Sequence, residues 1–203
     1  MKFLNILLLI LAAQAASAQI KVVKLSEKDV PKNMKFEGGF EQAMQYTDKE
    51  GTHVVITSEA VGGDDEDQRT GYVYAYNYLE VGSGVKLVWK LYDYTATCGE
   101  DVEAEFEPNT FSISDFNHNG IAEVWLMYFD ACKGDVSPSE LKVIMHEGIK
   151  KYAMRGTTRV KVNATDHVGG SYAFDDAFNA APAAFREYAK QLWKKNVNED
   201  HFY

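Results

Sequence analysis

Oxygen-bearing side chains recur at alternate positions in one short segment of the sequence. Asp115, Asn117 and Asn119 stand at positions 1, 3 and 5 of this segment, and Glu123 stands at position 9. Alternate residues of a tight loop turn their side chains toward one point, and Gly120 at position 6 allows the backbone to bend sharply there. A hard cation such as Ca²⁺ takes about six to eight oxygen ligands. The segment therefore predicts a Ca²⁺ site.

The residues that follow the glycine indicate which calcium motif this is. The segment resembles the start of an EF-hand loop, but Leu126 stands at position 12, where that loop needs a bidentate Glu. It is more similar to the strand–loop–strand calcium motif of FG-GAP and VCBS-type repeats, because an apolar run, 124–129, follows it. That resemblance implies side-chain ligands at Asp115, Asn117, Asn119 and Glu123, and a carbonyl ligand at Ile121.

The same residues also permit a loop without an ion. Asn119 and Gly120 form an Asn-Gly pair, which is a strong hairpin-turn signal in its own right. Among the side-chain ligands only Asp115 and Glu123 carry charge. Affinity for Ca²⁺ decreases as the number of charged ligands decreases. A structural calcium loop and an ion-free turn both remain open at this point.

The two cysteines of the chain, Cys98 and Cys132, lie on either side of this loop. In an oxidising compartment a single pair predicts one disulfide. Two unpaired thiols are the alternative. A bridge would clamp the chain around the candidate ion site, which is a structural role.

Four tyrosines follow one another at a spacing of two. They share one face of a predicted strand, because successive side chains of a strand point to opposite faces. Such a row is a candidate sugar-stacking platform. A sheet face packed by a helix or by long side chains is the alternative. The row consists of Tyr72, Tyr74, Tyr76 and Tyr78.

Paired carboxylates are the residues that a glycan-acting enzyme would need. Glu103 and Glu105 form one candidate pair, and Asp64 and Asp67 form another within a dense acidic run. Glycosidases hold two carboxylates about 5–10 Å apart across the scissile bond. Nothing in the sequence around these pairs predicts that geometry, so no catalytic residue is assigned.

The elements that position these residues are mostly strands. Alternating and β-branched runs predict strands at 54–57, 72–78, 85–91, 111–116, 124–129, 141–146 and 151–154. The glycine-containing loop between 72–78 and 85–91 predicts that these two strands form a hairpin. So many predicted strands in a short chain indicate a mainly β fold, which is an antiparallel sheet or a partial propeller or barrel-like domain. The spacing of Phe178, Ala181, Phe185, Tyr188 and Leu192 predicts a C-terminal amphipathic helix over about 180–196 that packs on the sheet.

The first residues of the chain predict export. Residues 1–18 combine Lys2, an apolar run and the small-residue pattern Ala16-Ser17-Ala18, which together are typical of a secretory signal peptide. Residues 19–203 then form a single β-rich domain without a membrane span. The formal net charge of -9 argues against nucleic acid as a partner, because nucleic-acid binding needs a basic surface.

A wider resemblance covers about Asp93 to Gly156. The runs 115–128, 136–142 and 145–156 are similar to a family of small exported Gram-negative bacterial proteins loosely associated with surface polysaccharide (lipopolysaccharide) biosynthesis. The resemblance implies a periplasmic, secreted or cell-surface location and supplies no catalytic residues. We therefore expect a non-enzymatic envelope-associated protein with a structural Ca²⁺ loop that contributes to surface polysaccharide assembly or binds a glycan or an envelope protein. The alternatives are a glycan-acting envelope enzyme and a purely structural secreted domain.

Overall fold

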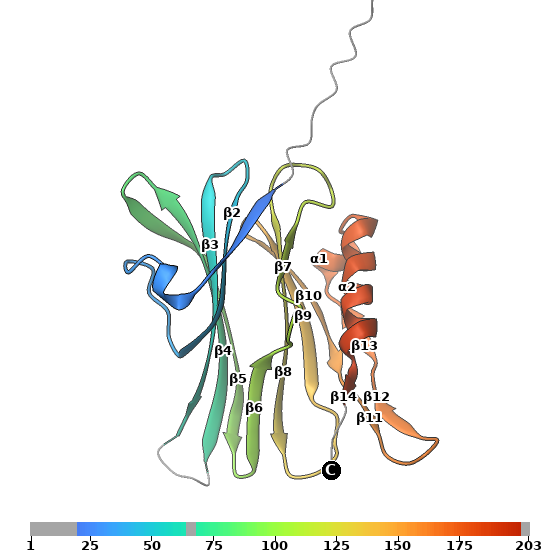
Figure 1. Cartoon of the computed structure of the whole chain (residues 1–203). Coiled ribbons are helices and arrows are strands. Elements are labelled where there is room, and N and C mark those ends of the chain that lie inside the picture. Colours follow the sequence, from blue (N-terminus) through green and yellow to red (C-terminus); the bar gives the residue numbers. More distant parts are fainter. Residues whose placement is uncertain (1–19, 64–67, 200–203) are drawn as a thin grey trace, which may run out of the picture.

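The computed structural model describes residues 20–63 and 68–199. Two large sheets and one helical layer lie side by side in this part of the chain (Figure 1). The predicted mainly β fold with a C-terminal helix is confirmed, and the sheets are open and largely antiparallel. The predicted signal peptide, 1–18, and the carboxylate pair Asp64 and Asp67 lie outside the described residues.

The first sheet contains five strands that follow one another both in sequence and in space. Its neighbouring strands are antiparallel, and the predicted hairpin of 72–78 with 85–91 lies in its last two strands. Gly82, at the turn of that hairpin, has a φ of 58°, a conformation that glycine adopts without steric cost. The strands are β1 (Lys21–Leu25), β2 (Gly39–Thr47), β3 (Thr52–Gly62), β4 (Arg69–Val81) and β5 (Gly84–Cys98).

The second sheet has the order β13-β10-β9-β8-β6, and β7 also pairs with β8. Its strands are β6 (Asp101–Phe106), β7 (Ser112–Ser114), β8 (Glu123–Lys133), β9 (Glu140–Glu147), β10 (Lys150–Thr157) and β13 (Tyr172–Phe174). A small third sheet joins β11 (Arg159–Lys161) to β12 (His167–Gly169) and, in parallel, to β14 (Asn198–Glu199).

A hydrophobic core fills the space between the two large sheets. Val55 and Leu91 of the first sheet pack in the same cluster as Leu126 and Ile144 of the second. Because side chains alternate along a strand, each central strand gives one face to this core and turns the other face outward. Each sheet therefore has an outer face that another part of the chain must cover or leave in water.

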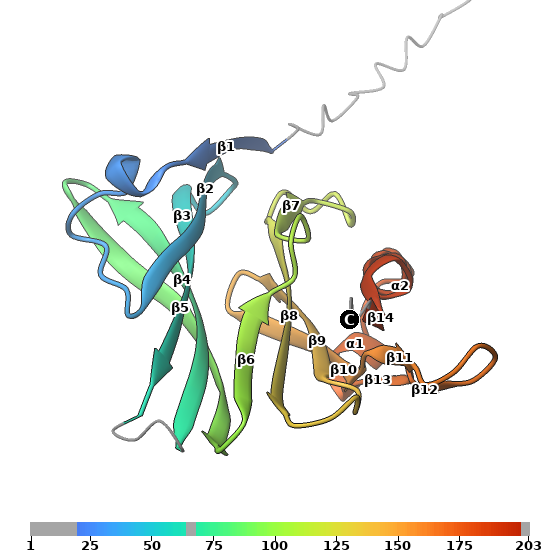
Figure 2. The same ribbon diagram turned by 60° about the horizontal axis from the view of Figure 1, so that its bottom comes forward.

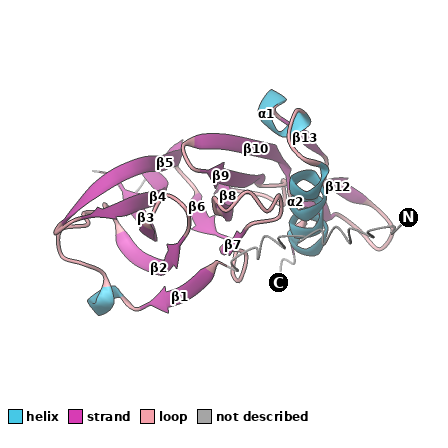
Figure 3. Cartoon of the chain, turned by 90° about the horizontal axis from the view of Figure 1, so that it is seen from above, coloured by secondary structure: helices cyan, strands magenta, loops and turns pink. Residues whose placement is uncertain are grey.

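The C-terminal helix covers the outer face of the second sheet (Figure 3). The predicted continuous helical stripe is interrupted: Phe178 belongs to α1 (Asp176–Asn179), and α2 (Ala183–Asn196) begins after Pro182. Proline lacks the N–H of a helix interior, so it stands at the N-cap instead. Within the described residues, neither helix has the length and apolar character needed to cross a membrane.

The segment between β1 and β2 covers part of the outer face of the first sheet. It includes the short 3-10 helix η1 (Glu27–Asp29), and it lies on the side of the sheet away from the second sheet (Figure 2). Met34 of this segment is buried against that face. The cover is formed by an irregular stretch of chain, so it leaves part of the face open.

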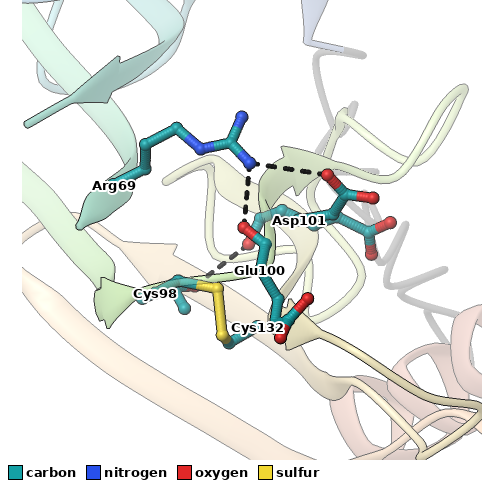
Figure 4. The surroundings of a disulfide bond; sticks show 7 residues. Arg69, Cys98, Glu100, Asp101 and Cys132 are labelled. Atoms are coloured by element: carbon teal, nitrogen blue, oxygen red, sulfur yellow. Dashed lines mark hydrogen bonds and ion pairs between the residues drawn. A yellow bond between two sulfur atoms is a disulfide. The ribbon is translucent and has the colours of Figure 1, made fainter. Parts of the chain in front are cut away.

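The predicted disulfide between Cys98 and Cys132 is confirmed. It joins the end of β5 to β8 and so ties the first sheet to the second (Figure 4). Beside it, the Arg69 guanidinium donates to the Glu100 carbonyl at 2.9 Å and lies 3.4 Å from the Asp101 carboxylate. These contacts hold the turn between β5 and β6 against β4.

Candidate functional site

The four tyrosines predicted to share a face do lie on one face of β4, the outer face of the first sheet. The register with β5 extends the row sideways, because Tyr72 pairs with Tyr94 and Tyr74 pairs with Tyr92. These two β5 tyrosines were not among the predicted stacking residues. Their spacing of two, directly across the predicted hairpin, was the signal that could have identified them.

One end of the tyrosine row is covered by the segment between β1 and β2. Tyr74, Tyr76 and Tyr78 expose only 7%, 4% and 8% of their surface. The Tyr78 hydroxyl donates to the Lys35 carbonyl, and the Tyr76 hydroxyl donates to a Glu37 carboxylate oxygen at 3.3 Å. Of the predicted stacking residues, these three therefore contribute to packing rather than to an open surface.

The other end of the row is open to solvent. Tyr92 and Tyr94 expose 51% and 49% of their surface, and Tyr72 is half-buried beside them. The ring centroids of Tyr92 and Tyr94 are 5.7 Å apart, and the Tyr72 ring lies 6.2 Å from that of Tyr92. We call these three residues the tyrosine platform.

Lys90 marks the boundary between the covered and the open parts of this face. Its ammonium lies 5.1 Å from the Tyr74 ring centroid and 5.6 Å from the Tyr92 ring centroid. It also forms a 2.6 Å ion pair with Glu37, whose hydrogen bond raises the pKa of Lys90. The cation is thus held above the rings.

The predicted calcium loop folds as a series of side-chain-to-backbone turns. The Asp115 carboxylate accepts from the Gly120 amide at 3.1 Å. The Asn117 side-chain oxygen accepts from the Asn119 amide at 3.0 Å, and that of Asn119 accepts from the Ile121 amide at 2.7 Å. The structure therefore gathers the predicted residues in one loop, where they hold its backbone.

Two carboxylates complete this loop, and one of them was not predicted. Glu123 is fully buried and accepts from the Ser114 hydroxyl at 2.7 Å and from the Phe116 amide at 2.8 Å. Burial raises the pKa of Glu123, although these hydrogen bonds oppose the shift. Glu147, at the end of β9, accepts from the amide groups of both asparagines. Only the pairing of β8 with β9 brings Glu147 opposite Glu123.

The loop has some features of a Ca²⁺ site and lacks others. One Asp115 carboxylate oxygen is buried without a hydrogen-bond partner, as expected of an atom that awaits a cation. However, Asn117 and Asn119 direct their amide nitrogens, not their oxygens, at Glu147. Within 20–63 and 68–199, no three His, Cys, Asp or Glu side chains form a group able to hold a metal ion.

The turn between β2 and β3 docks on the same loop. The Lys49 amide donates to the Gly120 carbonyl at 2.9 Å, and the Ala122 amide donates to the Asp48 carboxylate at 3.0 Å. The Lys49 ammonium also donates to the Asn119 carbonyl. The loop therefore links the first sheet to the second, with or without an ion.

The carboxylate pair Glu103 and Glu105 lies on a single strand. These residues lie two positions apart on β6, so their side chains leave the same face of one strand. A different group of charges lines a cleft of about 580 Å³ between β5, the end of β8 and the start of β9. There, the Lys142 ammonium lies 2.8 Å from Asp93 and 2.7 Å from Asp130.

No family model, curated protein or solved structure matches this chain.

Proposed function

We propose that this protein is a non-enzymatic, exported, envelope-associated protein that binds a glycan through its tyrosine platform. One observation carries the proposal: Tyr92 and Tyr94 leave about half of their surface in solvent, whereas Tyr74, Tyr76 and Tyr78 are covered. Tyrosine rings combine a broad apolar face with a polar hydroxyl. This combination suits a sugar ring, which presents C–H groups on its face and hydroxyls around its edge.

The exposure of these rings favours a binding role over a packing role. Tyr72, Tyr92 and Tyr94 lie next to one another instead of being scattered, and a contiguous apolar patch typically marks an interaction site. The three rings contact one another, and the Lys90 ammonium lies over the Tyr92 ring, so the ring positions are defined before a ligand arrives. A preorganised surface binds with a smaller loss of conformational entropy.

The cleft charges argue against the alternative of a glycan hydrolase. Asp93 and Asp130 both bind the Lys142 ammonium, which therefore occupies the space between their carboxylates. A hydrolytic pair must leave that space to the scissile bond, with one carboxyl group protonating the leaving oxygen. The arrangement fits binding better than hydrolysis.

Binding to an array of bacterial surface oligosaccharides tests the proposal. We expect Tyr92→Ala to weaken binding of the best array ligand about fivefold, because one stacked ring contributes about 1 kcal/mol. Leu87→Ala is the matched control, since Leu87 is 45% exposed on the same strand. Wild-type affinity in Tyr92→Ala and Tyr94→Ala would rule out the platform as the binding surface.

We further propose that the loop 115–123 holds a structural Ca²⁺. The buried, unpartnered oxygen of Asp115 supports this role, as do the nearby carboxylates of Glu123 and Glu147. Rotation of the Asn117 and Asn119 amides would present their oxygens to the ion in place of their nitrogens. The ion would then stabilise the loop that links the two sheets.

Thermal unfolding with Ca²⁺ and with chelator tests this second proposal. Saturation at about a hundredfold excess over Kd stabilises by about 2.7 kcal/mol, which raises Tm by about 5–10 °C in a domain of this size. Asp115→Asn should abolish the shift, whereas Asp166→Asn, in an exposed loop, should retain it. An unchanged Tm at millimolar Ca²⁺ would identify the loop as an ion-free Asn-Gly turn.

A further inference from the structure

Strand β5 forms a free edge of the first sheet. It pairs with β4 on one side, and within 20–63 and 68–199 no strand pairs with it on the other side (Figure 3). Its register with β4 is continuous from Trp89 to Thr95, a stretch about 23 Å long. A long, regular free edge is a template for pairing with another strand.

The backbone of this edge presents alternate residues to solvent. The Tyr94 amide donates to the carboxylate of the adjacent Asp93 at 3.1 Å, as expected of an amide that points away from β4. Alternate residues of an antiparallel strand turn their N–H and C=O groups to the same side, so Lys90 and Tyr92 share this orientation. Their backbone groups are therefore available to a further strand.

The second sheet extends beyond this edge. β6 packs against β4, and β8 packs against β5, while β9 and β10 follow β8 in the order of the second sheet. The Trp89 ring of β5 stacks on the His146 ring of β9, with centroids 4.1 Å apart, and Asp93 lies 2.8 Å from Lys142. Side chains of β9 therefore still reach β5, whereas β10 lies past the edge.

Two unpaired cations lie on the inward face of β10, and we call Lys151, Ala153 and Arg155 the shelf. Ala153 belongs to the core between the sheets and Tyr152 to the helix-covered side, so the shelf residues face the first sheet. Lys151 and Arg155 are exposed, and in the described part of the chain their side chains form no ion pair or hydrogen bond. Desolvation and the Arg155 guanidinium lower the pKa of Lys151, although Asp93 opposes this shift. The shelf thus carries two positive charges without a paired carboxylate.

We infer that β5 and the shelf bind an extended segment of a partner protein, which pairs with β5 as a sixth strand of the first sheet. In such strand addition, main-chain hydrogen bonds give affinity and alternate side chains give specificity. The inference concerns a protein partner and does not depend on the proposed glycan binding.

The shelf and the tyrosines specify the side chains of that segment. Packed sheets lie about 10 Å apart, so inward side chains of the added strand would reach the shelf. Lys151 and Arg155 are four residues apart on one face, so they select carboxylates at positions i and i+4 of the segment. Its outward side chains would lie beside Tyr92 and Tyr94, where β-branched or aromatic residues pack well.

The shelf also determines that the added strand is not β5 of a second copy. Antiparallel pairing of β5 with itself would relate the two copies by a twofold axis perpendicular to the sheet. The second sheets of both copies would then lie on the same side, and each extends past its own β5. They would occupy the same space, so the site fits a segment that carries no second layer of its own.

Fluorescence anisotropy with labelled nine-residue peptides tests the inference. The first peptide alternates Thr and Val and has Glu in place of Thr at its third and seventh positions, and the second has Lys at both. We expect the wild-type protein to bind the Glu peptide at least about tenfold more tightly than the Lys peptide. Equal binding of the two peptides, or binding of neither, would overturn the inference, while the oligosaccharide array still tests the platform separately.

Charge reversal on the shelf identifies the contact. The double variant Lys151→Glu with Arg155→Glu should prefer the Lys peptide, because the signs of both charge pairs are exchanged. Lys150→Glu is the matched control, since Lys150 is exposed and lies over the Tyr152 ring on the opposite face of β10. It should keep the wild-type preference within about twofold. An unchanged preference in the double variant would overturn the shelf as the charge contact.

N-methylated peptides separate strand pairing from charge attraction. A methylated amide cannot donate a hydrogen bond, and alternate amides of a strand face opposite edges. We expect N-methylation of one alternate set of residues in the Glu peptide to abolish binding and N-methylation of the other set to retain it. Equal binding of the two methylated peptides would overturn the added strand.

Discussion

The outer faces of the two sheets are covered in different ways. Helix α2 lies along the second sheet and buries Phe185, Leu192 and Trp193 against it. The first sheet is covered by the irregular segment between β1 and β2, which reaches Tyr76 and Tyr78 but leaves Tyr92 exposed. The helix-covered face of the second sheet therefore contributes to stability. The uncovered part of the first sheet's outer face stays in solvent, where a partner can reach it.

The geometry of the two covers explains this difference. Helix α2 has 14 residues and is therefore about 21 Å long, enough to place a row of side chains along a sheet. The segment over the first sheet contacts the tyrosines through the buried Met34 and through hydrogen bonds of the Tyr78 and Tyr76 hydroxyls to Lys35 and Glu37. It does not continue to the β5 tyrosines, so those rings remain in water.

The largest expected effect is on the helix-covered face. Phe185 is fully buried, with its ring centroid 5.7 Å from that of Tyr152. We expect Phe185→Ala to lower the free energy of unfolding by about 3–5 kcal/mol, because it leaves a cavity. Tyr92→Ala, on the open face, should lower it by about 1 kcal/mol or less. Urea denaturation measures both, and equal losses would contradict the division of roles.

Removing the disulfide tests whether the open face of the first sheet depends on the covalent link between the two sheets. Replacing Cys98 and Cys132 by Ser together should lower the free energy of unfolding by about 3–4 kcal/mol, since the bridge restricts the unfolded chain. The proposed glycan binding by the platform should persist at low temperature, because Tyr92 and Tyr94 remain paired with β4. Denaturation and glycan binding of the double variant measure the two effects. Loss of binding in a folded double variant would show that the bridge positions the platform.

The smallest expected effects are on the pH dependence of the free energy of unfolding, and they have opposite signs in the two sheets. Burial lowers the pKa of His146 in β9 to about 4 from its ordinary 6.5. Between these values the unfolded chain binds more protons, so His146 makes stability rise with pH. Burial raises the pKa of Glu59 in β3 to about 7 from 4.5. Glu59 therefore makes stability fall as pH rises across that range.

Variants separate these two contributions. His146→Phe should remove the rising component, leaving a profile that falls more steeply from pH 4.5 to 7. Glu59→Gln should remove the falling component. Chemical denaturation at several pH values gives the slopes, and a profile unchanged by His146→Phe would contradict the lowered pKa of the buried imidazole.

Local sequence patterns were sufficient for much of the fold. β-branched and aromatic runs predicted parts of β3, β4, β5, β8, β9 and β10, and a helical spacing predicted α2. They did not predict β1, β2 or β6. The sequence of β2, Gly39–Thr47, alternates poorly because several of its residues are polar, and its strand form depends on pairing with β1 and β3.

The candidate sites were also predicted only in part, because local patterns identify contiguous residues but not residues that strand pairing brings together. The loop 115–123 is contiguous in the chain, so its turn residues could be identified, whereas Glu147 reaches it only through the pairing of β8 with β9. The alternation in β4 determined that four tyrosines share a face. Which rings are open was decided by tertiary structure alone, because exposure depends on the distant segment that covers the sheet.

The sequence by itself determined the strand-rich character, the cysteine pair and the common face of the tyrosines, because each follows from residue type and short-range spacing. Only the tertiary structure placed Tyr92 and Tyr94 at an uncovered edge and surrounded Lys142 with the carboxylates of Asp93, Asp130 and Glu140. These arrangements bring together residues far apart in the chain, and their positions follow from strand register and from packing of the two sheets.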